Sequence, residues 1–301
     1  MKKHRFAVTA ILFALLFTAL GCTQVVQVGT TAGQQMGVIS AQDKAAIDRT
    51  AAAAQSAVRP MTEKEEYYLG RAVAATILSQ YRLENNDRLT DYVNRAGRVL
   101  AMVSDVPLTY GGYHFAILAS DEVNAISCPG GIIFISRGML DRVANEEELA
   151  AVLAHEIAHV NHRDGTKAIK SSRWVEVVTT LGSGLAQKYG PAELAKLTSL
   201  FEGSVNDVVK MLVTTGYGKE QEMAADRSAL VLMQRMGYDP NGLADYLERL
   251  AKEQTAGNKK GFFSTHPAMA DRLGVVRENI AGNKWGRIDH RTRDRRFKSY
   301  S

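Results

Sequence analysis

The chain has 301 residues, of which 46% are hydrophobic and 23% are charged. This balance predicts a globular protein and excludes a wholly disordered or fibrous chain. The formal net charge of +5 is confined to residues 284–301, where seven Lys and Arg face two Asp. The rest of the chain is balanced, which argues against a basic, nucleic-acid-binding body.

The N-terminus has the pattern of an export signal. Three basic residues among the first five precede an apolar run over residues 6–20, which is short for a membrane span of about 20 residues. Cys22 follows Gly21 directly, as at a bacterial lipoprotein processing site. We therefore expect a signal peptide over residues 1–21, a lipid on Cys22 and a place in the bacterial cell envelope. Thr23 favours the periplasmic face of the outer membrane, and ordinary secretion or an uncleaved anchor are the alternatives.

The next segment is interpreted as a lipidated N-terminus and tether over residues 22–60. It is rich in Gln, Ala, Thr and Gly, with a helix-prone part at Ala41–Val58. The only other cysteine, Cys128, lies in an apolar stretch. With Cys22 acylated, no disulfide can form within the chain, and Cys128 is expected to be a small buried residue.

The middle of the chain predicts one mostly helical α+β domain over residues 61–281, with a small sheet. Its expected helices cover residues 62–81, 87–104, 145–162 and 219–236, with one more after Pro240 and a last one from near Pro267. Short β-rich runs at 113–118 and 131–136 lie around Asn124-Ala125, with a turn at 129–131. Residues 166–215 read as mixed helical sequence broken by glycines.

The basic tail over residues 282–301 has no apolar periodicity. We interpret it as a solvated, poorly ordered end. Contact with anionic lipid head groups or RNA through its interleaved aromatic residues is the alternative.

Two histidines lie four residues apart in the helix that is expected to begin after Asn145. His155 and His159 project from one face, so their imidazoles can share one Zn²⁺. Glu156 points about 100° away and can instead take a proton from a water on the metal. The apolar neighbours predict a buried helix, and a metal explains why ionisable groups are placed there. His162 lies about 10 Å along the axis from His155, too far to share the ion.

The helix predicted over residues 219–236 offers a third ligand. Glu222 and Asp226 are four apart and share a face, and small residues beside them allow close packing on another helix. Glu222 would complete a His₂Glu set with water in the fourth place. Asp226 would accept the free N–H of a ligating histidine. Taken alone, the same stretch is also typical of an ordinary amphipathic helix with surface acids.

The order of these motifs resembles a known family. His-Glu-Ile-Ala-His at 155–159 and Glu-Met-Ala-Ala-Asp at 222–226 resemble the HtpX and CAAX-prenyl-protease type of zinc metallopeptidase. Residues 124–138, with Pro-Gly-Gly, resemble the strand and turn before its metal helix, and 264–273, with Ser-Thr-His-Pro, its C-terminal signature. The resemblance covers residues 60–281 and, with the lipoprotein-like start, is closest to the soluble periplasmic branch. It implies a gluzincin-type zincin fold.

The resemblance implies a zinc endopeptidase, with Glu156 as general base, that hydrolyses misfolded or misassembled envelope proteins. The Asn124-Ala125 strand would pair with an extended substrate, and His266 would be a fourth zinc ligand that holds the enzyme shut. Alternatively, His266 merely starts the last helix, and Arg272 either supports the site or pairs with an acid. A membrane-tethered chaperone or binding module with a structural zinc is the alternative function. No nucleic-acid partner is expected, and the sequence predicts neither the substrate nor the oligomeric state.

Overall fold

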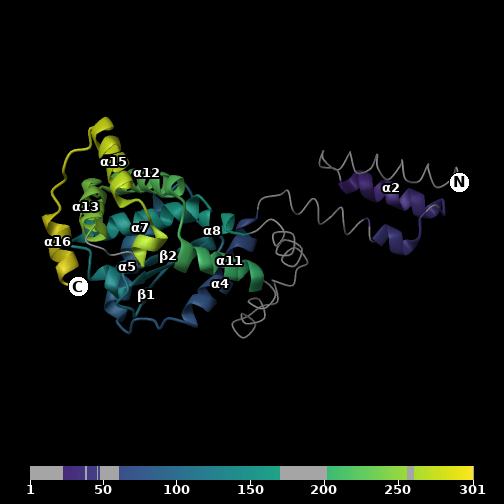
Figure 1. Ribbon diagram of the computed structural model, residues 1–301, viewed down its shortest axis with the longest axis horizontal. Helices are drawn as coiled ribbons and strands as arrows, with labels where there is room; N and C mark the ends of the chain where they lie inside the picture. The colour runs from purple at the N-terminus through teal and green to yellow at the C-terminus, as the bar shows by residue number, and fades with distance from the viewer. Residues whose placement is uncertain are drawn as a thin grey trace. The chain divides into compact units, whose positions relative to one another are not determined.

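A computed structural model describes residues 23–37, 39–45, 47, 61–169, 202–255 and 261–300 (Figure 1). The chain divides into two compact units. In the first, helix α2 (Thr23–Gln35) occupies part of the segment predicted as a tether. The predicted signal peptide, Cys22 and most of Ala41–Val58 lie outside the described residues. None of the helices in the described ranges is long and apolar enough to span a bilayer.

The second unit begins at Thr62 and has the predicted mixture of many helices and one small sheet. Its first half contains α4 (Glu63–Leu78), α5 (Asp87–Met102), β1 (His114–Leu118), β2 (Ala125–Cys128), the one-turn helix η2 (Pro129–Gly131), β3 (Ile132–Ser136), α6 (Arg137–Leu140), α7 (Glu146–Asn161) and α8 (Asp164–Lys167). Its second half contains α11 (Glu202–Lys210), η5 (Met211–Thr215), α12 (Lys219–Met236), α13 (Asn241–Thr255), α14 (Phe262–Thr265), α15 (Met269–Gly282) and α16 (Arg291–Lys298).

The sheet has the order β1-β3-β2, with β1 parallel and β2 antiparallel to β3. Strand β2 is therefore at the edge, and helix α7 packs against it. The turn between β2 and β3 needs glycine, because Gly130 has φ +77° and a Cβ there would lie 2.7 Å from Tyr67 Cα. This close approach fixes the end of β2 against α4.

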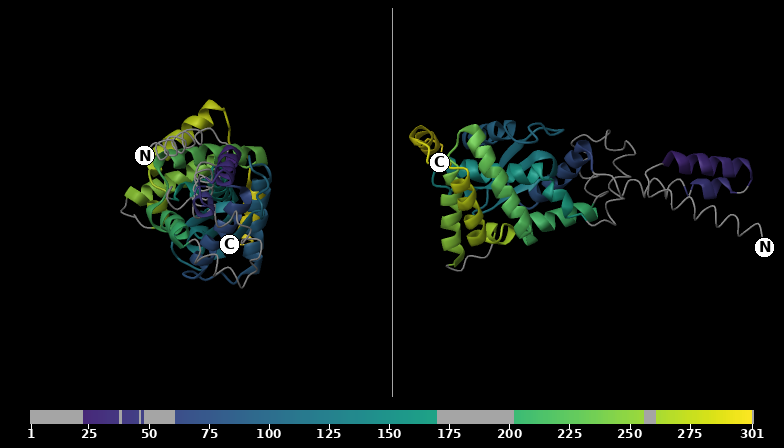
Figure 2. Two further views of the ribbon diagram at one scale, coloured as in Figure 1. Left: turned by 90° about the vertical axis from the view of Figure 1, so that its right-hand side faces the viewer. Right: turned by 90° about the horizontal axis from the view of Figure 1, so that it is seen from above.

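Helix α7 lies at the centre of the unit. It contacts α5, α12 and α13 as well as β2, and its residues from Glu146 to Val160 are all buried. Asn145 caps its first turn by accepting a hydrogen bond from Glu148 N, as the sequence predicts. The views in Figure 2 show the yellow helix α15 beside the green helices α12 and α13. The helix with the paired histidines is thus held on several sides.

The expectation of a poorly ordered basic tail is wrong. A helix does begin near Pro267 as predicted, at Met269, but it is not the last one. Helix α16 lies in the tail and packs against α7. Its Phe297 is buried, and Tyr300 stacks on Tyr92 of α5 with ring centroids 4.4 Å apart. Arg296 pairs with Glu146 and Arg293 with Glu147. We call Arg293, Arg296, Phe297 and Tyr300 the C-terminal clasp.

The arginines of the C-terminal clasp pair with buried glutamates in the first turn of α7. Glu146, Glu147 and Glu148 are each no more than 2% exposed, and a buried carboxylate needs cationic partners. Arg249 of α13 supplies the third cation, to Glu148. Four of the seven tail cations, counting Arg287 with Asp245 and Arg291 with Asp289, are paired within the chain, so most of the tail's charge is already engaged.

Candidate metal centre

Four buried side chains from three parts of the fold converge on one point. His155 and His159 come from α7, Glu222 from α12, and His266 from the residue after α14. Each offers one ligand atom, and these atoms all lie within 4.8 Å of one another. The structure therefore brings together the two histidines and the glutamate singled out by their spacing, and adds His266.

The distances within this group fit one shared ion. His155 Nε2 lies 3.1 Å from His159 Nε2 and 3.3 Å from His266 Nδ1. Glu222 Oε1 lies 3.0 Å from His266 Nδ1 and 3.3 Å from His159 Nε2. Tetrahedral ligands at about 2.0–2.1 Å from a zinc ion are about 3.3–3.4 Å from one another. These four distances are close to that spacing, and imidazole nitrogens and a carboxylate oxygen are donors that zinc accepts.

Asp226 and Arg272 form a second layer behind two of these residues. Asp226 Oδ1 lies 2.9 Å from His155 Nδ1, as predicted for a carboxylate that fixes the histidine tautomer. Arg272, which is 1% exposed, donates to both oxygens of Asp226 at 2.7 Å and lies 2.7 Å from Glu222 Oε2. Of the two alternatives for Arg272, support of the site is the one that this geometry favours.

The carboxylates of Asp226 and of the ligand Glu222 stay ionised despite their burial. Burial raises the pKa of Asp226, but Arg272 and His155 outweigh it and lower that pKa to about 2. Burial likewise raises the pKa of Glu222, and the charges of His266 and Arg272 hold it well below the usual range. Both groups are therefore available as acceptors or ligands at neutral pH.

Two residues beside His159 were missed by the sequence reasoning. Asp164 Oδ2 lies 2.9 Å from His159 Nδ1, and it is placed behind His159 as Asp226 is placed behind His155. Tyr217 stacks on the His159 ring at a centroid distance of 3.9 Å. An Asp five residues after the second histidine was a possible signal for the first. Tyr217 had no comparable signal, because it lies in the short stretch between η5 and α12.

Glu156 is a buried carboxylate next to the four ligands that accepts no hydrogen bond among the described residues. Both of its oxygens are buried and without a hydrogen-bond partner among the described residues, and His266 Nε2 is 3.7 Å from Oε1. A buried carboxylate without a partner is costly and rare in a folded protein. The unmatched oxygens fit a site that also takes up a polar group, such as a water on a metal ion.

The predicted substrate strand lies at the sheet edge, but part of that edge is occupied. Thr265 Oγ1 lies 3.3 Å from Asn124 Oδ1, and Phe262 N donates to Val123 O at 2.7 Å. Ala125 begins β2 and is buried. The segment that carries His266 to the metal centre thus also contacts the residues where we expect substrate to pair.

The remaining sequence predictions concern His162 and Cys128. His162 Nε2 lies 3.0 Å from Ser228 Oγ, outside the group of four ligands. Cys128 is fully buried, as predicted for a small core residue. Burial also raises the pKa of its thiol above the usual range, which makes it a poor nucleophile.

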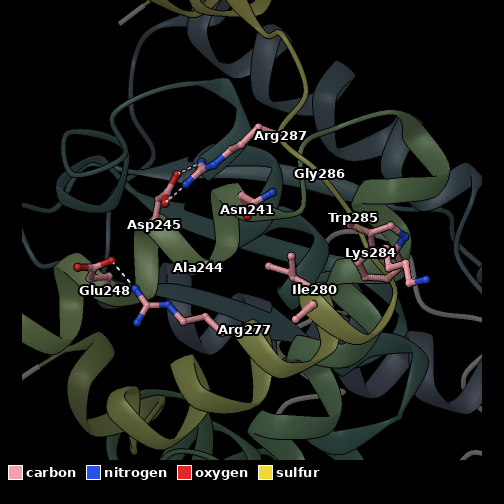
Figure 3. A pocket seen from close by; sticks show the side chains of 11 residues that line it. Asn241, Ala244, Asp245, Glu248, Arg277, Ile280, Lys284, Trp285, Gly286 and Arg287 are labelled. Carbon is pink, nitrogen blue, oxygen red and sulfur yellow. Dashed lines mark hydrogen bonds and ion pairs between the residues drawn. The ribbon is translucent and has the colours of Figure 1, made fainter.

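A surface pocket between α13 and α15 lies apart from these residues (Figure 3). It is lined by Trp285 and by two ion pairs, Arg287 with Asp245 and Arg277 with Glu248. None of the predicted site residues lines it. The pocket is therefore not part of the candidate metal centre.

A family model described as peptidase family M48 matches residues 87–280, which include all four clustered ligands. The chain belongs to peptidase family M48. This agrees with the HtpX-type resemblance in the sequence motifs. Family membership and the buried His and Glu donors together indicate a metal site in this M48 domain.

Several known proteases are similar in sequence to this M48 chain. The beta-barrel assembly-enhancing protease of Yersinia pestis is 29% identical over 272 residues, covering 88% of this chain and 52% of the relative. Its namesake from Escherichia coli K12 is 28% identical over 218 residues, covering 71% and 43%. Metalloprotease LoiP of Escherichia coli K12 is 27% identical over 199 residues, covering 65% and 71%. The chain thus spans about half the length of the two beta-barrel assembly-enhancing proteases.

Proposed function

We propose that the chain is a zinc-dependent endopeptidase that hydrolyses misfolded or misassembled proteins of the cell envelope. The observation that carries the proposal is the buried carboxylate of Glu156, which has no hydrogen-bond partner among the described residues, beside four clustered donors. Family membership and the names of the similar proteases support it. Two His and one Glu are a donor set that catalytic zinc sites use.

Different residues of the chain would have different roles in peptide hydrolysis. His155, His159 and Glu222 would hold the zinc ion, with Asp226 and Asp164 fixing the orientation of the two imidazoles. The ion would supply a Lewis acid for the substrate carbonyl and would lower the pKa of the attacking water. Glu156 then accepts a proton from that water and returns it to the leaving nitrogen as the peptide bond breaks.

His266 is proposed to act as a latch. As a fourth protein donor it would leave no open position for water, and four protein ligands are the mark of a closed zinc site. Residues 261–265 contact Val123 and Asn124 at the same time. Displacing this one segment would therefore free both a metal position and the sheet edge for an extended substrate.

The location of the enzyme is proposed from the N-terminal sequence. A signal peptide over residues 1–21 and a lipid on Cys22 would anchor the chain at the periplasmic face of the outer membrane. The names of the beta-barrel assembly-enhancing proteases support a substrate among envelope proteins. The anchor would then keep the peptidase close to its substrates.

A second candidate is a tethered chaperone or binding module with a structural zinc. The observation in its favour is the group of four donors, because structural sites use all four positions for protein ligands. His266→Ala separates the two functions, since opening the latch should raise the cleavage of a denatured protein. A structural site predicts no cleavage before or after this substitution.

The metal dependence of the activity tests the proposal. Removal of the metal with a chelator should abolish cleavage of a denatured envelope protein, and zinc should restore it. Circular dichroism during the chelation controls for unfolding. Cleavage that continues in the metal-stripped, folded chain would contradict the proposed mechanism.

A further inference from the structure

A group of aromatic and aliphatic side chains lies on the surface near the start of α4, outside the metal centre. The rings of Tyr67, Tyr68 and Tyr110 lie with their centroids 5.3, 5.5 and 6.5 Å apart. Leu108, in the same loop as Tyr110, is 79% exposed, and Tyr110 is 52% exposed. We call these four residues the tyrosine patch.

The loop of the tyrosine patch sits directly on α4. A Cβ at Gly111 would lie 2.1 Å from the ring of Tyr67, so only glycine allows this approach. Tyr113, two residues further, is buried and donates to Val106 O at 2.9 Å, which closes the loop. The loop is therefore held against α4, and its Leu108 side chain is exposed to solvent. Exposed aromatic and apolar side chains that gather in one region are typical of an interaction surface.

The cations on one face of α4 indicate the kind of partner, although the first turn of the helix also carries the exposed Glu63 and the buried Glu65 and Glu66. Lys64, Tyr67, Tyr68 and Arg71 follow each other at helical spacing and share one face. The Arg71 guanidinium lies 5.7 Å from the centre of the Tyr67 ring. Tyrosines flanked by Lys and Arg side chains are typical of surfaces at a membrane–water interface. There the rings enter the acyl boundary, and the hydroxyls and cations stay with the head groups.

The position of the tyrosine patch in the chain agrees with a bilayer as partner. Helix α4 begins at Glu63, directly after the segment interpreted as the tether, and Tyr67 is about 6 Å further along its axis. A lipid on Cys22 would tether this domain to the membrane through the residues that precede α4. This step rests on the lipid anchor of the proposed function.

We propose that the tyrosine patch is a membrane-contacting face that seats the peptidase domain on a phospholipid bilayer. Leu108 enters the acyl boundary, the three tyrosines lie at the head-group level, and Lys64 and Arg71 face lipid phosphates. The lipid anchor holds the chain at the membrane, and the tyrosine patch fixes how the domain is oriented on it.

A tryptophan introduced by Leu108→Trp tests this directly. The full chain carrying this substitution is reconstituted in vesicles of phosphatidylethanolamine and phosphatidylglycerol, with and without brominated acyl chains. Its emission is read as a difference from the unsubstituted chain, which has two tryptophans. We expect a blue shift and a loss of emission with brominated lipid.

Leu83→Trp is the matched control. Leu83 is also exposed, at 52%, but it lies in the chain beyond the other end of α4, a helix about 24 Å long. We expect little quenching at this position. Equal quenching at both positions, or none at Leu108→Trp while the chain sediments with the vesicles, would overturn the membrane face and leave the anchor intact.

Failure of the anchor can be told apart from failure of the tyrosine patch. A chain that does not sediment with vesicles contradicts the anchor, and the Leu108→Trp chain is then added from solution to an excess of vesicles. Quenching there supports the membrane face, and its absence refutes it. A blue shift produced by a soluble denatured protein instead of vesicles would also refute it and would make the surface a polypeptide docking site.

Discussion

The C-terminal clasp leads to a prediction about stability. Arg296 is bidentate to Glu146, with Nε donating to Oε2 at 2.8 Å. Glu146 is 1% exposed and also accepts from the hydroxyls of Tyr92 and Tyr238. Breaking a fully buried ion pair costs about 3–5 kcal/mol. Because the Arg296 side chain is 51% exposed and the two phenols remain, we expect Arg296→Ala to lower the free energy of unfolding by about 2 kcal/mol.

Urea denaturation of the purified chain measures this loss, and Arg291→Ala is the control from the same helix. Arg291 is 84% exposed and pairs with the exposed Asp289, so its removal should cost at most about 0.5 kcal/mol. If both variants unfold like the unsubstituted chain, the clasp does not stabilise α7, and the tail is a solvated end after all.

The pH dependence of the same measurement follows from Glu146. Burial raises its pKa, but Arg296 and Tyr92 outweigh burial and lower the pKa below its ordinary 4.5. The folded protein therefore binds this proton more weakly than the unfolded chain. Its contribution to stability is present above about pH 4.5 and is lost as the pH falls through the lowered pKa. The difference between Arg296→Ala and the unsubstituted chain should accordingly shrink in acid.

Three further predictions concern other parts of the domain. Asp164→Asn removes the charged partner of His159 and should weaken zinc binding roughly 10–100-fold in a chelator competition; unchanged affinity would exclude this role. Burial raises the pKa of Glu66 to about 7, so stability contributed by its proton is lost as the pH rises from about 4.5 past 7. Glu66→Gln should then be more stable than the unsubstituted chain by up to about 3 kcal/mol in urea at alkaline pH, and equal stability there would contradict this. Gly130→Ala should lower the free energy of unfolding by roughly 1–3 kcal/mol, because Gly130 has a φ of +77° and lies against Tyr67. Gly274→Ala is the control: this glycine has open space around it in α15, and its substitution should be neutral or stabilising in the same assay.

The parts of the site that lie on regular helices could be placed from the sequence. His155 and His159 share a face because they are one turn apart, and Glu222 and Asp226 do so for the same reason on α12. The sequence also showed that small residues would let these helices pack closely. The packing of α12 on α7 places Glu222 opposite the histidines. This packing is a tertiary contact, and the periodicity of the sequence alone does not predict it.

The parts that depend on irregular backbone could not be placed in this way. Asp164 reaches His159 because Arg163 adopts a left-handed conformation, with φ 56°, and turns the chain back at the end of α7. His266 follows the short helix α14, and only the family resemblance brought it forward. The clasp was missed for a different reason. Its cations look like a solvated tail until the buried glutamates that they neutralise are known.

The cleavage of a denatured envelope protein by Glu156→Gln, measured together with bound zinc, tests the central claim most directly. The glutamine has nearly the same shape and no basic oxygen, and Glu156 is not among the four clustered donors. We expect zinc to be retained at the level of the unsubstituted chain while cleavage falls to background. Cleavage at the unsubstituted rate by the zinc-loaded variant would show that Glu156 is not the base.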